Sequence, residues 1–573
     1  MANNVSSIGA APFHLSDSDL AWVEDSLAGM SLEEKVGQLF CLAVPAPDVP
    51  DILKKADSIG LRPAAFMLRP MPARRVQDII EALRNWTRIP LLFAANLDRG
   101  GDGVALEGTC FSTPLGVAAT DDEAMAYRFG LVCGREASAL GINWTFGPAV
   151  DIDFNYRNPI TNTRTYGDDP DRVARLSRAY VRGVRECGIA VTLKHWPGDG
   201  VDFRDQHLLP SVNALSPSDW DATYGKVYRA LIEDGAQCVM SAHILQPAYT
   251  RLLDPAVPRE KVLPASLCPQ LNEGLLRGRL GFNGLIVSDA TSMAGMTAAM
   301  RREDAVPACI VAGCDMFLFT LDMEVDFKYM LRGVKSGKIS ARRLDEAVGR
   351  TLALKASLGL HRAEPRSAGV PRESTLKALG CAEHLEWARE CADKSITLVK
   401  DTQGIVPIRS DSHKRILLFC LGEVPSDEGN IELLLSLLQA EGFVVTRFKN
   451  ESGPGKEWDS PLWNDPIGYL SGYDLALYYA RYPNASGQTA IRIKWQAPMG
   501  IDVPKFVHDI PTVFVSMDNP YLLQDVPMVK TYINAYSTNP ATIRAVVEKL
   551  VGKSRFVGKS PVDPFCGLED AAI

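Results

Sequence analysis

Short apolar runs that end in polar residues alternate with helical patterns over about residues 30 to 360 of the chain. Such alternation is typical of parallel strands joined by crossover helices. The predicted strands span residues 64–68, 90–95, 141–146, 189–193, 237–240, 284–287 and 316–319. The polar residues at or just after their ends are Arg69, Asp98, Asp151, Lys194, His195, His243 and Asp289. Active-site residues of a barrel gather at the carboxyl ends of its strands, whereas an open doubly wound sheet gathers ligands at one switch point. We therefore expect a (β/α)8-type TIM barrel.

The chain is too long for one ordinary hydrophobic core. With 573 residues it is expected to form two domains. The barrel is predicted over residues 1–360, a linker rich in Pro, Gly and charge over 361–380, and a second domain over 381–573. Apolar runs in the second domain alternate with helical patterns and lie at 395–400, 415–421, 475–479 and 512–516. This domain is therefore predicted to be a smaller three-layer α/β/α sandwich.

Composition and charge exclude several classes of protein. The net charge is −8, with 46% hydrophobic and 23% charged residues, as in a globular enzyme and unlike a nucleic-acid binder with a basic surface. Residues 1–20 lack a signal-peptide pattern, and no window reaches the roughly 18 to 20 apolar residues of a membrane span. The 12 cysteines form no Cys-x-x-Cys pair, which predicts free thiols in a reducing compartment. We expect a cytoplasmic protein with no nucleic-acid or membrane partner.

The first stretch that carries chemistry is Val-Thr-Leu-Lys-His-Trp-Pro-Gly-Asp-Gly-Val-Asp-Phe-Arg-Asp-Gln-His, residues 191–207. An apolar strand delivers Lys194 and His195 at its end, and a loop with Pro and Gly follows. Asp205 and His207 lie side by side only if the loop is extended there. A neighbouring carboxylate orients an imidazole and favours its protonated form, which suits an acid/base near neutral pH. The alternative is a surface loop that carries a solvated His and Asp.

The second stretch is Gly-Phe-Asn-Gly-Leu-Ile-Val-Ser-Asp-Ala-Thr-Ser-Met-Ala-Gly, residues 281–295. Its apolar run at 285–287 predicts a buried strand that ends at Asp289 and presents this carboxylate at the mouth of the barrel. The alternative is that Asp289 caps a helix that begins near Thr291.

Together the two stretches resemble the β-N-acetylglucosaminidase (β-N-acetylhexosaminidase) branch of glycoside hydrolase family 3. The matching signature is Lys-His-aromatic-Pro-Gly-x-Gly, followed after four residues by Asp-x-His. The resemblance implies that Asp289 is the catalytic nucleophile and that His207, paired with Asp205, is the general acid/base. It also implies that Lys194 and His195 hold hydroxyls of the sugar.

Three further sugar-binding residues are implied by the same resemblance. Arg164, in Asn-Thr-Arg-Thr-Tyr-Gly, matches an Arg that contacts the sugar, and Asp98, in Asn-Leu-Asp-Arg-Gly-Gly, matches an Asp that grips distal hydroxyls. His243, in Met-Ser-Ala-His-Ile, matches a barrel-strand segment. For His243 the alternative is a structural histidine, and Asp151 is a structural candidate of the same kind.

The sequence departs from the branch at three positions. Trp196 occupies the place of the usual Phe, and Asp199 that of a frequent second loop His. Gly100 stands where a Glu is usual near the distal-sugar Asp. The first change keeps an aromatic ring, whereas the second alters the hydrogen bonding of the loop.

We therefore expect a retaining glycosidase that removes β-linked N-acetylglucosamine from chitin or peptidoglycan fragments through a covalent glycosyl-enzyme. A neutral imidazole does not repel an anion, so a phosphorylase is an alternative, as is a β-glucosidase of the same fold. Outside catalysis, the alternative is a sugar-binding protein that has lost its reaction. No metal or cofactor is expected, because the chain has no His-Glu-x-x-His spacing, phosphate loop or dinucleotide fingerprint. The expected partner is a carbohydrate substrate, and the expected assembly is a monomer or homodimer.

Overall fold

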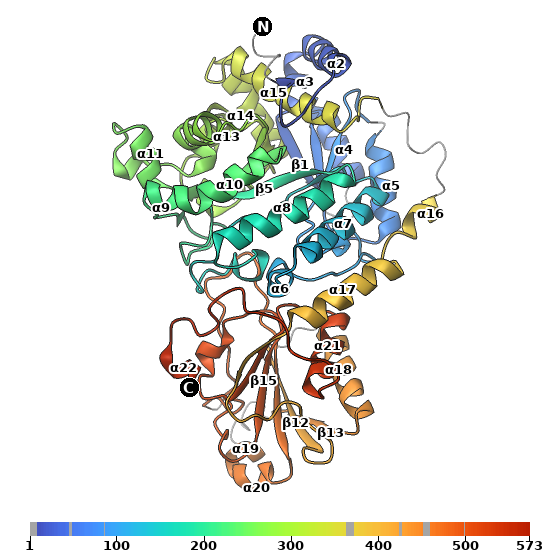
Figure 1. Ribbon diagram of the computed structural model, residues 1–573. Helices are drawn as coiled ribbons and strands as arrows, with labels where there is room; N and C mark the ends of the chain where they lie inside the picture. The colour runs from blue at the N-terminus through green and yellow to red at the C-terminus, as the bar shows by residue number, and fades with distance from the viewer. Residues whose placement is uncertain are drawn as a thin grey trace. The chain divides into compact units, whose positions relative to one another are not determined.

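The computed structural model describes residues 8–44, 49–84, 86–362, 372–422, 427–450, 459–497 and 499–573. The chain divides into two compact units (Figure 1). The first comprises Met1–Phe111, Ala126–Thr161 and Asp169–Leu385, and the second comprises Ser112–Met125, Asn162–Asp168 and Glu386–Ile573. The second unit therefore includes two short segments from the first half of the chain. The linker expected at 361–380 stays a prediction, and residues 363–371 of it lie outside the described residues.

The first unit is built on a parallel eight-stranded sheet that curves into a barrel. In the order in which they pair, the strands are β10 (Phe317–Leu318), β1 (Phe40–Val44), β2 (Ala65–Leu68), β3 (Leu92–Ala95), β4 (Trp144–Thr145), β5 (Ala190–Trp196), β7 (Cys238–Ser241) and β9 (Leu285–Ser288). A parallel bridge between Val287 of β9 and Met316, next to β10, brings the two ends of the sheet together. The predicted TIM barrel is confirmed.

A helix follows each barrel strand before the next one begins, as a (β/α)8 fold requires. In chain order these helices are α4 (Val49–Ile59), α5 (Ala73–Arg84), α7 (Glu123–Leu140), α8 (Pro170–Glu186), α10 (Tyr224–Glu233), the π-helix η5 (Gln270–Arg279), α13 (Arg302–Val311) and α14 (Met323–Lys335). Figure 1 shows α8 and α10 side by side on the outside of the barrel.

Of the eight barrel strands, the one that the sequence pattern did not predict is β1. It begins at Phe40, directly after the short helix α3 (Leu32–Gly37) and the residues that end it. The Ser31 hydroxyl accepts from the N–H of Glu34 at 3.1 Å, and the Glu34 carboxylate accepts from the N–H of Ser31 at 2.9 Å. These two reciprocal bonds form a capping box. Because so few residues separate helix and strand, their apolar residues form one run in the sequence.

The barrel strands are buried at every position, except for the partly exposed Ala43 of β1. Alternate residues of neighbouring strands, such as Leu92 and Ala94, Cys238 and Met240, and Leu285 and Val287, belong to a single hydrophobic core. The residues between them lie under the surrounding helices. Both faces of each strand are therefore apolar, which explains the continuous apolar runs in the sequence.

The remaining elements of the first unit are short, apart from two helices that pack on each other, α2 (Asp17–Ala28) and α15 (Ala341–Ser357). The short ones are α9 (Pro217–Ala222), α11 (Pro247–Leu253), α12 (Ala294–Thr297), α16 (Arg372–Leu376), the paired strands β6 (Ser211–Val212) and β8 (Ile244–Leu245), and the 3-10 turns Gly101–Gly103, Arg259–Lys261 and Ala265–Leu267.

The second unit is built on a six-stranded mixed sheet. In pairing order its strands are β11 (Thr397–Asp401), β16 (Thr531–Asn534), β15 (Thr512–Ser516), β14 (Leu475–Ala480), β12 (Arg415–Leu421) and β13 (Val444–Arg447). Only the pairing of β11 with β16 is antiparallel among these described strands. Strands β13 and β16 were not predicted, whereas β12 and β15 have the predicted bounds.

Helices cover both faces of this sheet. Leu418 of β12 lies in one core with residues of α18 (Glu428–Ala440) and α21 (Pro540–Leu550). Its neighbour Phe419 lies in a second core with Leu462 of α19 (Pro461–Asn464) and Leu470 of α20 (Pro466–Leu470). The predicted three-layer sandwich is confirmed. The remaining helical elements of the second unit are α6 (Pro114–Ala119), α22 (Glu569–Ala572) and the 3-10 turns Asn162–Arg164 and Leu522–Asp525. Helix α17 (Ala382–Ser395) begins in the first unit and continues into the second.

All 12 cysteines are free, and most are buried. None of the described helices has both the length and the apolar character needed to cross a membrane. In the part of the chain that the structure describes, no group of three or more His, Cys, Asp or Glu is arranged to hold a metal ion.

A buried ion cluster lies at the amino-terminal end of the last barrel strand. Asp315 precedes β10 and accepts from Arg277 at 2.7 Å and from Arg343 at 2.6 Å, with Arg350 at 3.5 Å. It also accepts from the N–H of Ile286 in β9 at 2.9 Å. Burial raises the pKa of Asp315, but the three guanidinium groups and the Ile286 bond outweigh burial and hold the pKa below its usual range. This carboxylate therefore ties η5 and α15 to the closing strands.

Asp315→Ala should lower the free energy of unfolding of the first unit by about 3 to 5 kcal/mol, because it leaves three buried cations without their shared carboxylate. Urea denaturation measures the loss. The control is Asp304→Ala, which removes an exposed carboxylate that lies 3.2 Å from Lys338 and should cost at most about 1 kcal/mol. Equal losses in the two variants would contradict a structural role for the cluster.

Candidate active site

Asp205 and His207 lie side by side, as the sequence predicts, but in a turn and not in an extended loop: the N–H groups of Leu208 and Leu209 donate to the Asp205 carbonyl at 3.0 Å and 2.9 Å. The Asp205 carboxylate accepts from Nδ1 of His207 at 2.6 Å and from the backbone N–H of the same residue at 2.8 Å. The Asp205 side chain is 1% exposed and the His207 side chain 28% exposed. Because the carboxylate holds Nδ1 from the buried side, the ring is oriented and its Nε2 is the nitrogen left for proton transfer with a ligand.

Asp289 follows β9 at the carboxyl end of the barrel and is 8% exposed. Its backbone N–H donates to the carbonyl of Ser241 in β7 at 2.8 Å, which continues the strand pairing. Its Oδ1 accepts from the N–H of Ala290 at 2.7 Å. The nearby helix α12 is preceded by Met293 and has no side-chain cap. Asp289 therefore does not cap a helix, and the alternative for this residue is wrong.

The Asp289 carboxylate is kept ionised. Burial raises its pKa, but the charges of His195, His243 and His207 and the hydrogen bond from Ala290 outweigh burial, so the pKa lies below its usual range. A buried, ionised carboxylate at a strand end is suited to attack an electrophilic carbon.

His195 forms a second imidazole–carboxylate pair. Its Nδ1 donates to Oδ2 of Asp151 at 2.7 Å, and its backbone N–H donates to Oδ1 at 3.0 Å. Both side chains are almost fully buried. Burial raises the pKa of Asp151. The charge and hydrogen bonds of His195 lower this pKa by more than burial raises it, so the carboxylate stays ionised. Asp151 therefore orients His195, as Asp205 orients His207.

Lys194 and Asp98 lie together, although they come from different strands. Nζ of Lys194 lies 3.3 Å from Oδ1 of Asp98 and 3.4 Å from Oδ1 of Asn96. The Lys194 side chain is 3% exposed and that of Asp98 is 25% exposed. An ammonium group and a carboxylate at the end of the barrel are a donor and an acceptor of the kind that bind sugar hydroxyls.

His243 is fully buried, and both nitrogens of its ring are bonded. Nδ1 lies 2.7 Å from the Ser266 hydroxyl, and Nε2 lies 3.0 Å from the carbonyl of Ala290. Burial lowers the pKa of this imidazole, against the opposing charge of Asp289. Nε2 therefore donates to the carbonyl and Nδ1 accepts from Ser266, as expected for a histidine that supports the segment after Asp289.

Arg164 lies in a 3-10 turn, Asn162–Arg164, that belongs to the second unit. The other predicted site residues belong to the first unit. A sugar contact by Arg164 therefore stays a prediction.

The loop after β5 passes very close to its neighbours. Gly200 has a φ of 107°, and a Cβ there would lie 1.9 Å from the carbonyl oxygen of Ile152. Gly198 has a φ of 118°, and its Cβ would lie 2.2 Å from the ring of Tyr224. Only glycine fits these positions, because both the backbone conformation and the space exclude a side chain.

Asp199 and Asn158 hold the same loop from inside. Oδ1 of Asp199 accepts from Nδ2 of Asn158 at 2.8 Å and from the N–H of Gly200 at 2.7 Å. Asn158 also donates to the carbonyl of Asp202 at 2.7 Å. Burial and then the charge of Asp151 raise the pKa of Asp199 to about 8. The carboxyl that replaces a loop His is therefore protonated at neutral pH.

Sequence reasoning missed two residues that shape the site, Asn158 and Gln206. Gln206 lies between Asp205 and His207, and its Nε2 donates to Oδ2 of Asp289 at 3.2 Å. Its position inside the motif was a signal, but nothing in the sequence shows which distant residue its amide reaches.

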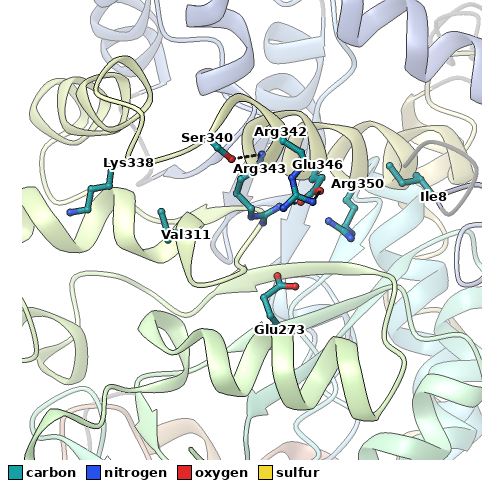
Figure 2. Close-up of a pocket in the computed structure, with 9 residues that line it drawn as sticks. All are labelled: Ile8, Glu273, Val311, Lys338, Ser340, Arg342, Arg343, Glu346 and Arg350. Atoms are coloured by element: carbon teal, nitrogen blue, oxygen red, sulfur yellow. Dashed lines mark hydrogen bonds and ion pairs between the residues drawn. The ribbon is translucent and has the colours of Figure 1, made fainter. Parts of the chain in front are cut away.

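A pocket of about 440 Å³ lies elsewhere in the first unit (Figure 2). In Figure 2, the side chains of Arg343 and Arg350 point from α15 toward Glu273. Both guanidinium groups lie within 3.5 Å of Asp315, at the amino-terminal end of β10. The pocket is therefore at the opposite end of the barrel from Asp289 and His207, and its cations already have carboxylate partners.

Two comparisons with known proteins bear on this arrangement. The family model described as "Glycosyl hydrolase family 3 N terminal domain" matches residues 31–354. A "Beta-N-acetylglucosaminidase/beta-glucosidase" of Cellulomonas fimi is 46% identical over 570 residues, which are 98% of this chain and 99% of that protein. The chain belongs to glycosyl hydrolase family 3. The predicted family and the predicted glycosidase class are confirmed.

Solved structures of family 3 proteins extend the likeness to both units. The structure described as "Beta-glucoside phosphorylase BglX" has a TM-score of 0.92 and 46% identity, and the match covers 99% of each chain. A family 3 β-N-acetylglucosaminidase from Paenibacillus sp. str. FPU-7 has a TM-score of 0.76 and 25% identity, over 94% of this chain and 99% of that one.

Asp199→Asn should become more stable relative to wild type as the pH rises from about 4 to 8. The folded-state pKa of Asp199 lies near 8 against an ordinary value of 3.8, so folding holds a proton in this window. Wild type then loses stability as the pH rises, at up to about 1.4 kcal/mol per pH unit, whereas Asn has no proton to lose. Urea denaturation from pH 4 to 9 checks the prediction, and a difference that does not change with pH would contradict it.

Proposed function

We propose that this family 3 enzyme removes β-linked N-acetylglucosamine from chitin or peptidoglycan fragments by a retaining mechanism. The observation that carries the proposal is the pairing of a buried, ionised Asp289 with a partly exposed His207 that Asp205 orients. The loop of His207 is hydrogen-bonded to Asp289 through Gln206. This arrangement supplies a nucleophile and a proton donor to the same end of the barrel.

In the first step, the Asp289 carboxylate attacks the anomeric carbon, and the imidazolium of His207 protonates the leaving oxygen as its bond to that carbon breaks. In the second step, the neutral imidazole takes a proton from water, which displaces Asp289 and releases the sugar. Asp205 orients the ring and stabilises the imidazolium, since it bonds to Nδ1 at 2.6 Å.

Lys194, Asp98 and His195 are proposed to bind hydroxyls of the sugar. Nζ of Lys194 lies 3.3 Å from the Asp98 carboxylate. The ring of His195 is held by Asp151. Arg164 and His243 are proposed as further sugar contacts. Both ring nitrogens of His243 are already hydrogen-bonded, so a contact with the sugar would have to replace one of these bonds. The main role proposed for His243 is therefore to support the segment after Asp289.

The choice of sugar rests on two similar proteins. The relative from Cellulomonas fimi is described with N-acetylglucosaminidase and glucosidase activities, and the Paenibacillus structure as a β-N-acetylglucosaminidase. We infer that N-acetylglucosaminides are the main substrates and that β-glucosides are the second class to test.

Phosphorolysis is a second candidate. The structure with 46% identity is described as a β-glucoside phosphorylase. A neutral imidazole base carries no negative charge, so it does not repel an incoming phosphate as a carboxylate base does. His207 is therefore compatible with either acceptor.

The setting of the reaction is also a proposal. The free, mostly buried cysteines support a reducing compartment, and we place the enzyme in the cytoplasm. A monomer or homodimer is proposed, and the reaction scheme requires no metal or cofactor.

Asp289→Ala should reduce turnover of aryl β-N-acetylglucosaminides at least about 1,000-fold, because the covalent intermediate no longer forms. Release of the aryl group measures the rate for N-acetylglucosaminide, glucoside, xyloside and N-acetylgalactosaminide substrates. Wild-type rates in this variant would refute Asp289 as nucleophile.

His207→Ala should slow substrates with poor leaving groups about 100- to 10,000-fold and activated aryl glycosides far less, because only the former need a proton. The control is His413→Ala, an imidazole on a turn of the second unit that bonds within its own turn. A uniform loss for all leaving groups would argue against acid/base catalysis by His207.

The acceptor is identified by the products formed with and without inorganic phosphate. For hydrolysis, free sugar forms at a rate that does not depend on phosphate. For phosphorolysis, a sugar 1-phosphate forms and the rate rises with phosphate concentration. Mass spectrometry and phosphorus NMR distinguish the two.

A further inference from the structure

Gln206 is fully buried and bonds at both ends of its side-chain amide. Its Nε2 donates to Oδ2 of Asp289 at 3.2 Å, and its Oε1 accepts from the N–H of His243 at 2.8 Å. One amide therefore connects the loop that carries His207 to the proposed nucleophile and to His243, in the segment after β7. The amide therefore links the two groups that the proposed reaction uses, the Asp289 carboxylate and the His207 imidazole.

The backbone of the loop is held against the same region. The N–H of Gly295 donates to the carbonyl of Gln206 at 3.0 Å, and the N–H of Ala294 donates to the carbonyl of His207 at 3.1 Å. A Cβ at residue 295 would lie 3.1 Å from the Gln206 carbonyl oxygen and 2.7 Å from Cβ of His243. The loop is therefore packed directly onto the segment that follows Asp289.

We propose that Gln206 is a positioning residue that couples the acid/base loop to the nucleophile. The inference rests on the proposed roles of Asp289 and His207. The amide donates to the ionised carboxylate and at the same time fixes the loop, so that His207 and Asp289 keep one geometry in both steps of the reaction.

The two oxygens of Asp289 depend on different parts of the chain. Oδ1 is held by the N–H of the next residue, Ala290, at 2.7 Å, and this bond is local. Oδ2 is held by Gln206, which is 83 residues away in the sequence. Loss of the amide therefore leaves the carboxylate with its local bond but removes its link to the loop.

The amide also affects the charge of Asp289. A hydrogen bond to the ionised form of a carboxylate favours that form. His195, His207 and His243 are the titratable groups that face Asp289. Without the amide bond, ionisation of Asp289 depends on these imidazoles and Ala290 alone, so the carboxylate should protonate at a higher pH.

The test compares Gln206→Met with Gln246→Met. Gln246 is equally buried, and its amide bonds the carbonyl of Leu215 at 2.8 Å and the N–H of Tyr249 at 2.7 Å. The two substitutions are identical in shape and in the number of bonds lost, but only Gln206 reaches Asp289. Steady-state rates with an aryl N-acetylglucosaminide are measured from pH 4 to 9, with unfolding midpoints for both variants.

Gln206→Met should lower kcat/KM about 10- to 100-fold, as expected for the loss of one hydrogen bond to a charged group. The acidic limb of its pH profile should move up by about one pH unit. Gln246→Met should leave the acidic limb in place even if it destabilises the protein. The coupling would be overturned if the acidic limb stayed in place in both variants, or if it moved by the same amount in both.

Gln206→Glu gives an independent test of the same bond. While protonated, the introduced carboxyl can still donate to Asp289, so activity at low pH should exceed that of Gln206→Met. As the pH rises, the proton is lost and two carboxylates face each other, so activity should fall well below that of wild type. A profile that parallels wild type at all pH values would overturn the proposal.

Labelling separates failure of this inference from failure of the proposed function. Wild type is treated with a 2-deoxy-2-fluoro-β-glucosyl fluoride, and the modified residue is found by peptide mass spectrometry. No adduct on Asp289 would overturn the proposed function and the inference with it. An Asp289 adduct in wild type, together with unchanged kinetics in Gln206→Met, would overturn the coupling alone.

Discussion

Closure of the parallel sheet is the constraint on which the site depends. Because the eight strands are parallel and β9 meets the start of β10 at the Val287–Met316 bridge, all their carboxyl ends form one ring. Asp98 follows β3, Lys194 lies near the end of β5 and Asp289 follows β9, so the three side chains are brought to the same end of the barrel. An open sheet with the same strands would spread these side chains along an edge. The ion cluster around Asp315 supports closure from the other end, where it bonds the start of β9.

Charge compensation decides which carboxyl groups stay ionised in this buried end. Asp151 and Asp205 each bond an imidazole, and the Asp289 carboxylate faces three of them. Asp199 has no imidazole partner, and the nearby charge of Asp151 adds to the effect of burial on its pKa. It therefore takes the place of a loop histidine without adding a negative charge at neutral pH. Of the three carboxylates held ionised in this way, Asp151 and Asp205 each bond an imidazole, whereas Asp289 is bonded by the N–H of Ala290 and the amide of Gln206, as suits its proposed role as nucleophile.

Local patterns in the sequence predicted much of the fold and the residue types of the site. Seven barrel strands and four sandwich strands, β11, β12, β14 and β15, were predicted close to their observed bounds, because most of them are continuous apolar runs. Strand β1 was missed because it follows α3 almost directly, and β13 was missed because its residues are partly exposed. Asp205 and His207 were correctly expected side by side, but the expected extended loop was wrong: the pair lies in a turn, where the Asp205 carboxylate accepts from the N–H of His207.

The sequence by itself determined which side chains are available at the strand ends and that Asp205 and His207 are close enough along the chain to pair. The tertiary structure alone decided that Asp289 does not cap α12, that the His243 ring is bonded on both sides, and that Arg164 belongs to the second unit. It also decided that Asp151 orients His195 and that Gln206 reaches Asp289. The physical reason is that these contacts join residues that are 44 and 83 positions apart. Periodicity and motif spacing describe neighbours along one segment, whereas closure of the barrel determines which segments meet.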